Sequence, residues 1–162
     1  MHRGATRRAS NRTQHATRWA GQSSDPWQSY PSSERILIVD DNQDAAELLG
    51  LMLRNSGYQT EIAYDGQAAI EATQRFVPDV VVSDIGLPDM TGYEVAQRLR
   101  ADARLQRTAL IALTGWGTPE DRSKAIASGF NVHLTKPVSA EDLHAALDGA
   151  AVRRHRRAAL AS

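Results

Sequence analysis

Five polar residues stand directly after apolar runs in this 162-residue sequence, and together they could do chemistry. They are Asp40, Asp41, Asp84, Thr114 and Lys136. Three carboxylates that lie close together repel one another unless a cation is bound among them, and oxygen ligands with no nearby His or Cys select Mg²⁺ over zinc. A lysine and a threonine hydroxyl beside such a cluster supply positive charge and a donor for an anion, of which a phosphoryl group fits best. The inferred cofactor is Mg²⁺.

The segments that must position these residues alternate between two kinds. Strands are expected at Ile36–Val39, Tyr58–Ala63, Val80–Val82, Ala109–Leu113 and Asn131–Thr135. Helices are expected at Asp44–Ser56, Gly66–Phe76, Gly92–Ala101, Pro119–Ser128 and Ala140–Val152. Continuous apolar runs of strand length are typical of parallel strands that are covered on both faces. The alternation predicts an α/β fold, in which a five-stranded parallel sheet has helices on both faces and right-handed crossovers.

Start and stop signals support these helices. Thr91 and Glu94 have the spacing of a capping box, Pro119 stands at a first helical position, and Gly57 and Gly129 follow expected helix ends. In an open parallel sheet, ligands bind outside the carboxyl ends of the strands. The five polar residues are therefore expected to converge at that edge of the sheet.

Composition narrows the class of protein. Hydrophobic residues make up 41% of the sequence and charged residues 23%, which is ordinary for a globular protein. No apolar run approaches the roughly 20 residues that a membrane span needs, so no membrane association is expected. Cysteine is absent, which excludes disulfides, thiolate metal sites and a cysteine nucleophile.

Charge is unevenly distributed along the chain. Residues 34–149 contain 10 basic and 18 acidic residues, a formal charge of −8, whereas both ends are rich in arginine. The predicted organisation is a disordered basic N-terminal tail at 1–33, one domain at 34–150 and a basic C-terminal tail at 151–162. The composition of the first tail is also that of an organelle transit peptide. An acidic domain argues against nucleic acid as the main ligand.

Four short motifs match a known family in order and spacing. They are Ile36-Leu37-Ile38-Val39-Asp40-Asp41-Asn42, Asp84-Ile85-Gly86-Leu87-Pro88-Asp89-Met90-Thr91-Gly92, Ala112-Leu113-Thr114-Gly115 and Leu134-Thr135-Lys136-Pro137. Each motif alone is weak, but the four in this order are specific. The segment from about residue 34 to 150 resembles the receiver domain of two-component response regulators.

The resemblance implies a flavodoxin-like fold with strand order 2-1-3-4-5. It also implies that Asp84 accepts a phosphoryl group from a histidine kinase or a histidine phosphotransfer protein. Asp41 would ligate Mg²⁺ directly and Asp40 mainly through water. Asp84 and the backbone carbonyl of Gly86 would complete the protein ligands.

The resemblance assigns two more residues to the acyl phosphate and one to a switch. The Thr114 hydroxyl and the Lys136 ammonium would hold the phosphoryl group, and the peptide bond before Pro137 is cis in such domains. Inward movement of Thr114 is usually followed by a Tyr or Phe three residues before the lysine. This chain has His133 there. The imidazole either moves with Thr114 as a switch or is an ordinary surface histidine.

Two further positions bear on how long the phosphoryl group survives. Gly86 has no side chain that could orient a hydrolytic water, and Trp116 either covers the site or is an exposed loop aromatic. Slow self-dephosphorylation is expected. Gly92 and Gly115 are expected to serve backbone geometry and close packing.

The resulting hypothesis is a cytoplasmic phosphoacceptor without an effector domain, not an enzyme with a separate substrate. Its output is expected from a changed surface on the helix at Pro119–Ser128, the strand at Asn131–Thr135 and the helix at Ala140–Val152. It could be a single-domain regulator, a phosphate sink or relay, or a receiver fragment of a hybrid histidine kinase. The output partner is unknown, and a homodimer is left open.

Functions of other classes remain as alternatives. An aspartyl-phosphate phosphatase of the haloacid dehalogenase type uses similar residues, but Asp41-Asn42-Gln43 lacks its Asp-x-Asp motif. A flavodoxin would need a phosphate-binding loop after the first strand, which is absent. The Arg153–Arg157 cluster could bind a polyanion, or its arginines could simply favour a helix C-terminus.

Overall fold

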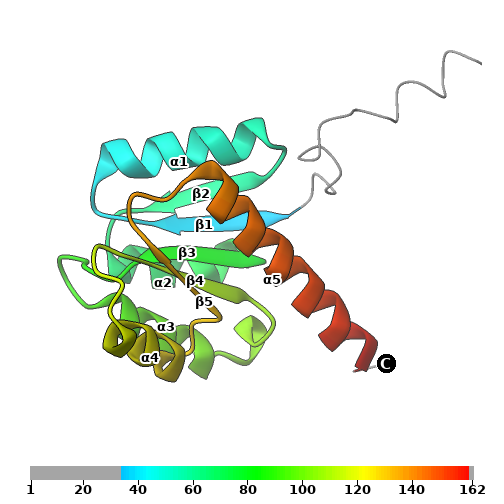
Figure 1. Cartoon of the computed structure of the whole chain (residues 1–162). Helices are drawn as coiled ribbons and strands as arrows, with labels where there is room; N and C mark the ends of the chain where they lie inside the picture. Colours follow the sequence, from blue (N-terminus) through cyan, green and yellow to red (C-terminus); the bar gives the residue numbers. More distant parts are fainter. Residues whose placement is uncertain (1–33, 161–162) are drawn as a thin grey trace, which may run out of the picture. The chain divides into compact units, whose positions relative to one another are not determined.

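The computed structural model describes residues 34–160, and the predicted tail at residues 1–33 lies outside this range. Five parallel strands form one sheet in the order β2-β1-β3-β4-β5 (Figure 1), so the predicted fold class and strand order are confirmed. The strands are β1 (Arg35–Val39), β2 (Gln59–Ala63), β3 (Val80–Asp84), β4 (Ala109–Thr114) and β5 (Val132–Thr135).

In residues 34–160, five α-helices and one short 3-10 helix accompany the strands, and the last helix follows the last strand. They are α1 (Gln43–Asn55), α2 (Gly66–Arg75), α3 (Gly92–Ala101), η1 (Ala103–Leu105), α4 (Pro119–Ser128) and α5 (Ala140–Leu160). The bounds of α3 and α4 are those expected from the sequence, and those of α1 and α2 differ by one residue. None of the helices in the described part of the chain is long and apolar enough to cross a membrane.

The sheet separates two apolar layers, because successive strand residues point to opposite faces. Ile36 and Ile38 of β1 pack with Leu53 of α1 and with Leu143 and Leu147 of α5 on one face. The alternate β1 residues pack on the other face in a cluster with residues of α2, α3 and α4. Residues 36–39 are 0% exposed. Burial on both faces explains why the strands are continuous apolar runs.

Local signals fix where the helices begin and end. The capping box at the start of α3 is present, since Thr91 Oγ1 accepts from the Glu94 amide and the Glu94 carboxylate accepts from the Thr91 amide. Gly129 ends α4 with φ of 113°, a left-handed conformation that glycine adopts readily. The cap of α1 is Asn42, whose side chain accepts from the Ala45 amide.

Two parts of the helical prediction were wrong. Helix α5 continues to Leu160 instead of ending at Val152, so it runs through most of the segment predicted as a basic tail. That segment is rich in alanine and arginine, which are strong helix formers, although it was predicted only as a basic tail. The short helix η1 was not expected. Its N-cap is Asp102, whose carboxylate accepts from the Arg104 amide.

Candidate functional site

Three carboxylates meet at the carboxyl edge of the sheet, as the sequence predicted. Asp40 follows β1 and is only 4% exposed, Asp41 is exposed, and Asp84 is the last residue of β3. Each offers one oxygen to a group whose atoms all lie within 4.8 Å of one another. Strands β1 and β3 are neighbours in the sheet, which is why residues 44 positions apart converge.

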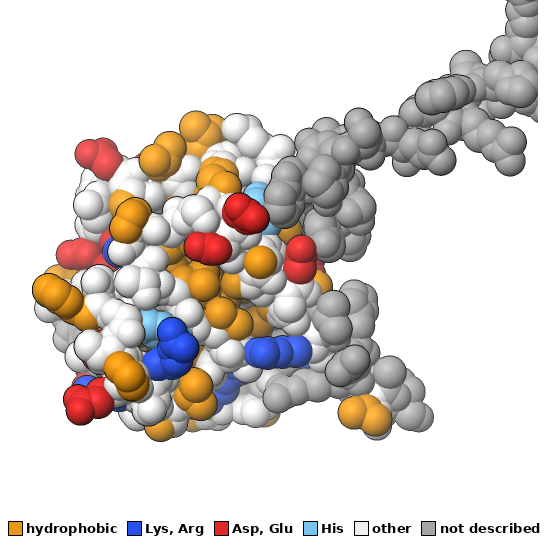
Figure 2. Space-filling view, in the orientation of Figure 1, with side chains coloured by type: hydrophobic (Ala, Val, Ile, Leu, Met, Phe, Trp, Pro, Cys, Tyr) orange, Lys and Arg blue, Asp and Glu red, His pale blue; other side chains and the backbone are white. Residues whose placement is uncertain are grey.

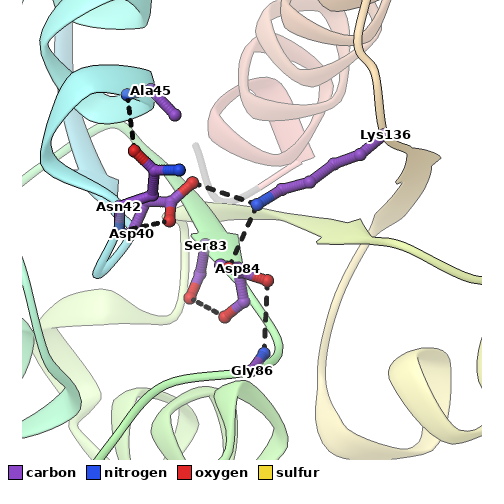
Figure 3. A network of polar contacts seen from close by, with 7 residues as sticks. All are labelled: Asp40, Asn42, Ala45, Ser83, Asp84, Gly86 and Lys136. Carbon is purple, nitrogen blue, oxygen red and sulfur yellow. Dashed lines mark hydrogen bonds and ion pairs between the residues drawn. The ribbon is translucent and has the colours of Figure 1, made fainter.

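Lys136, the first residue after β5, reaches across to two of these carboxylates (Figure 3). Its Nζ donates to Asp40 Oδ2 and to Asp84 Oδ2, both at 3.1 Å. Partial burial lowers the pKa of Lys136, but the hydrogen bonds and charges of Asp84 and Asp40 outweigh this effect and raise the pKa above its usual 10.5. The lysine is therefore a permanent cation within the cluster.

Main-chain groups orient the same two carboxylates (Figure 3). The Asn42 amide donates to Asp40 Oδ1 at 3.0 Å, and the Gly86 amide donates to Asp84 Oδ1 at 3.2 Å. The hydroxyl of Ser83, which is 1% exposed, donates to the carbonyl of Asp84 at 2.9 Å. Neither Asn42 nor Ser83 was expected to have a role at this site. An asparagine three residues before Ala45, at the expected start of a helix, was a cap signal that could have been recognised.

Thr114 lies at the end of β4, next to the cluster in the sheet, but its hydroxyl has other partners. Thr114 Oγ1 donates to the carbonyl of Trp116 at 2.8 Å and also lies 2.8 Å from His133 Nε2. The Lys136 amide donates to the carbonyl of Thr114 at 2.7 Å. The structure thus brings Thr114 together with His133, and holds the main chain of Thr114 against that of Lys136.

The indole of Trp116 does not cover this site, because it is 79% exposed. Of the two interpretations of Trp116, the structure therefore shows the exposed loop aromatic. Only the main-chain carbonyl of Trp116 contacts the Thr114 hydroxyl. The peptide bond between Lys136 and Pro137 is cis, as expected.

Asp89 is a functional candidate that the sequence analysis did not single out. It lies in the loop between Asp84 and α3, and its two oxygens accept from the Gly66 and Gln67 amides, both at 2.8 Å. These hydrogen bonds, that of Gly66 first, lower the pKa of Asp89 below its usual 3.8. The carboxylate thereby ties this loop to the first turn of α2. The spacing of apolar residues in the sequence could not have revealed this contact, because the two amides lie 23 and 22 residues away from Asp89.

The donor set fits a hard divalent cation. One lysine cannot neutralise three carboxylates, and oxygen ligands are those that Mg²⁺ prefers. The side chain of Asp84 is 15% exposed and that of Asp40 is 6% exposed, so water screens their repulsion incompletely. These three residues could therefore hold Mg²⁺.

A family model described as the response regulator receiver domain matches residues 36–148. The chain belongs to the response regulator receiver domain family. The fold of this domain is also similar to that of solved receiver structures. The chemotaxis protein CheY4 of Vibrio cholerae is 30% identical, with a TM-score of 0.70 over 73% of this chain and 98% of the other. The receiver domain of a signal transduction histidine kinase from Syntrophus aciditrophicus is 31% identical, with a TM-score of 0.67 over 72% of this chain and 89% of the other.

Curated relatives of this receiver differ in what surrounds the matched region. An uncharacterized 14.6 kDa protein of Leptolyngbya boryana is 39% identical over 108 residues, which are 67% of this chain and 82% of that protein. The transcriptional regulatory protein TrcR of Mycobacterium tuberculosis is 38% identical over 115 residues, 71% of this chain and 44% of that protein. The chain thus spans about half the length of the transcriptional regulators that it matches. Receiver domains act in two-component signalling, with histidine kinases as partners and Mg²⁺ bound at an acidic pocket.

Proposed function

We propose that this receiver is a Mg²⁺-dependent phosphoryl acceptor, and that Asp84 takes the phosphoryl group from a phosphohistidine of a histidine kinase or a histidine phosphotransfer protein. The observation that carries the proposal is the position of Lys136 Nζ, at 3.1 Å from both Asp84 and Asp40 within the acidic cluster. The ammonium group in that position can bind the oxygens of an incoming phosphoryl group without first having to move into the site.

In the proposed transfer, a carboxylate oxygen of Asp84 forms the new bond to phosphorus. The bond between phosphorus and the histidine nitrogen breaks, and its electron pair stays on the imidazole, which then takes up a proton. Mg²⁺, held by Asp40, Asp41, Asp84 and the backbone carbonyl of Gly86, would neutralise the repulsion between the carboxylate and the phosphoryl oxygens. No separate substrate is turned over, so the chemistry is that of a phosphoacceptor.

Lys136 and Thr114 are the proposed ligands of the acyl phosphate. Lys136 already faces Asp84 and keeps its charge, because its pKa is raised. The Thr114 hydroxyl would have to leave the Trp116 carbonyl to reach a phosphoryl oxygen. Such a movement is the proposed origin of an output surface on α4, β5 and α5. Family membership favours this function over the phosphatase alternative.

The cellular setting is also part of the proposal. A cytoplasmic location stays a prediction, as do the roles of both basic segments. The similarity to the receiver of a histidine kinase and to the receivers of transcriptional regulators supports either a stand-alone regulator or one receiver of a larger signalling protein.

The test is incubation of the purified protein with acetyl phosphate, with and without Mg²⁺, followed by mass spectrometry of the intact protein and its peptides. We expect one base-labile phosphoryl group on Asp84, formed only with Mg²⁺. Asp84→Asn should not be modified. Asp142→Asn, which changes an exposed carboxylate at the start of α5, is the matched control and should be modified as in the wild type. Modification of Asp84→Asn to the same extent would contradict the assignment.

A further inference from the structure

The Thr114 hydroxyl is the centre of a three-group hydrogen-bond chain whose direction can be worked out. A hydroxyl has one proton to donate, and a backbone carbonyl can only accept. Thr114 Oγ1 donates that proton to the carbonyl of Trp116 at 2.8 Å. His133 Nε2, at 2.8 Å from the same oxygen, must therefore carry a proton and donate it to Thr114. The chain runs from His133 through Thr114 to Trp116.

We propose that His133 is a positioning residue for Thr114, and that its Nε2–H donor fixes which way the hydroxyl proton points. Because Thr114 Oγ1 always accepts from the imidazole, its own proton must go to a separate acceptor. In the resting protein that acceptor is the Trp116 carbonyl. After transfer to Asp84, a phosphoryl oxygen replaces the carbonyl as acceptor, while the imidazole keeps its bond and follows the hydroxyl. This inference rests on the proposed function of Asp84.

The position of His133 in the sheet allows this contact. His133 pairs with Ala112 across β4 and β5, and Thr114 lies two residues further along β4 on the same face. Of the residue types that the resemblance implied here, phenylalanine has no donor and a tyrosine hydroxyl can either donate or accept, whereas a ring nitrogen that carries a proton can only donate. The direction of the proton is therefore a property of the histidine.

The surroundings of the other ring nitrogen keep the imidazole neutral. His133 Nδ1 is buried and has no hydrogen-bond partner among residues 34–160, so a second proton there would be a buried donor without an acceptor. Two charged residues of α4 act on the ring. Arg122 disfavours the protonated, positively charged form of His133, and Asp121 favours it. Burial and Arg122 prevail and lower the pKa of His133 below 6.5. The neutral ring retains the single N–H that Thr114 requires.

The first measurement is the tautomer, which does not depend on phosphorylation. In protein labelled with ¹⁵N in its histidines, NMR at about pH 7.5 should show His133 with its proton on Nε2. A rapidly exchanging mixture of the two tautomers, or a neutral ring with its proton on Nδ1, would overturn the proposal.

The second measurement uses two variants of His133 of unequal donor capacity. In His133→Gln the amide N–H can replace the Nε2–H, whereas His133→Phe fills the space without a donor. Amide shifts in α4 and β5 are recorded with acetyl phosphate and Mg²⁺, and are scaled by the fraction of Asp84 phosphorylated in each sample. The equilibrium constant for the switched state should be near wild type in the Gln variant and about twofold lower in the Phe variant, because the bond from Nε2–H polarises the hydroxyl and this strengthens its bond to a charged phosphoryl oxygen more than its bond to a neutral carbonyl.

The outcomes separate this inference from the proposed function. If Asp84 is not phosphorylated in the wild type, the proposed function is refuted. The proposed replacement of the Trp116 carbonyl by a phosphoryl oxygen is then refuted as well. If Asp84 is phosphorylated and the Phe variant switches as fully as the wild type, only the role of His133 is refuted. Equal losses in the Gln and Phe variants would show that ring shape matters and the donor does not, which also refutes the proposal.

Discussion

Gly92 lies so close to the end of β3 that a β-carbon on it would be 2.5 Å from the carbonyl oxygen of Asp84. The same β-carbon would be 2.8 Å from the α-carbon of Ile85, and the Gly92 amide donates to the Ile85 carbonyl at 2.8 Å. The first residue of α3 thus packs directly against the main chain of the proposed phosphoacceptor. The expectation of close packing is confirmed for Gly92, but a β-carbon at Gly115 would meet nothing within 4 Å.

Gly92→Ala should therefore destabilise the protein by about 1–3 kcal/mol, because rigid backbone atoms have to move. It should also lower the rate of phosphorylation by acetyl phosphate, since Asp84 is displaced. Gly149→Ala is the matched control: nothing lies within 4 Å of its β-carbon, and alanine in a helix is about 0.5–1 kcal/mol better than glycine. Urea unfolding of both variants measures the contrast, and similar free energies of unfolding for the two would refute the packing argument.

Mg²⁺ should stabilise the folded protein through the acidic cluster. At a free concentration of 100 times Kd the expected gain is about 2.7 kcal/mol, and EDTA should reverse it. Lys136→Met removes the cation that lies 3.1 Å from two carboxylates, so it should lower the Tm without Mg²⁺ and enlarge the increase that Mg²⁺ causes. Asp41→Asn should reduce that increase. Thermal unfolding with a magnesium titration tests all three proteins, and an unchanged Mg²⁺ effect in Asp41→Asn would argue against this ligand.

Asp89 should stabilise the protein in a pH-dependent way. Its pKa is lowered in the folded state by the amides of Gly66 and Gln67, so its contribution is present above the unfolded value of 3.8 and is lost as pH falls through the lower folded value. The Tm of Asp89→Asn should lie below that of the wild type near neutral pH, because one side-chain oxygen is replaced by a donor that faces an amide. The gap should narrow as pH falls toward about 3. A gap that is constant with pH would show that the charge of Asp89 is irrelevant.

His133 should make the protein less stable in mild acid. Its pKa is lowered on folding by burial and by Arg122, so the unfolded chain binds a proton that the folded protein does not, from pH 6.5 down to the folded pKa. The Tm of the wild type relative to His133→Gln should therefore fall between about pH 7.5 and about pH 5. Other groups titrate equally in both proteins and cancel in the difference. A relative Tm that rises on acidification would mean that folding favours the imidazolium.

The phosphoryl group should be lost slowly from Asp84. Gly86 has no side chain that could orient a water, and the exposed Trp116 indole can only donate a hydrogen bond. Trp116→Glu places a carboxylate that can accept a proton from water at this position, so it should shorten the half-life of the phosphorylated protein. Decay followed by mass spectrometry decides the matter. A shorter half-life for the wild type than for the variant would contradict the prediction.

The sequence predicted the parts of the site that follow from strand order. Asp40, Asp84 and Lys136 each come directly after or at the end of an apolar strand, and parallel strands bring such ends to one edge. The capping box of Thr91 and the glycine at 129 were equally visible, because each signal lies within a few residues of the chain. Local patterns were sufficient in all these cases.

Contacts between distant segments could not be predicted in this way. Arg100 donates to the carbonyls of Gly129, Leu105 and Thr108 and to the side chain of Asn131, and nothing in its neighbourhood distinguishes it from a solvated charge. The amide partners of Asp89 and the tautomer of His133 also depend on three-dimensional neighbours. The true end of α5 is a local feature that was missed, since the helix was expected to end at Val152 although the alanines and arginines that follow favour a helix.

The chemistry of this domain and its outward faces are encoded in separate sets of residues. The proposed reactive side chains stand at strand ends, whereas Leu48 and Leu51 of α1 and Ile126 of α4 are apolar and more than half exposed on helices. A substitution on such a helix face leaves the buried strands and the strand ends untouched. Changes in what the outer faces contact can therefore accumulate separately from changes in the proposed phosphoryl chemistry, so that one reactive edge can serve domains with different partners.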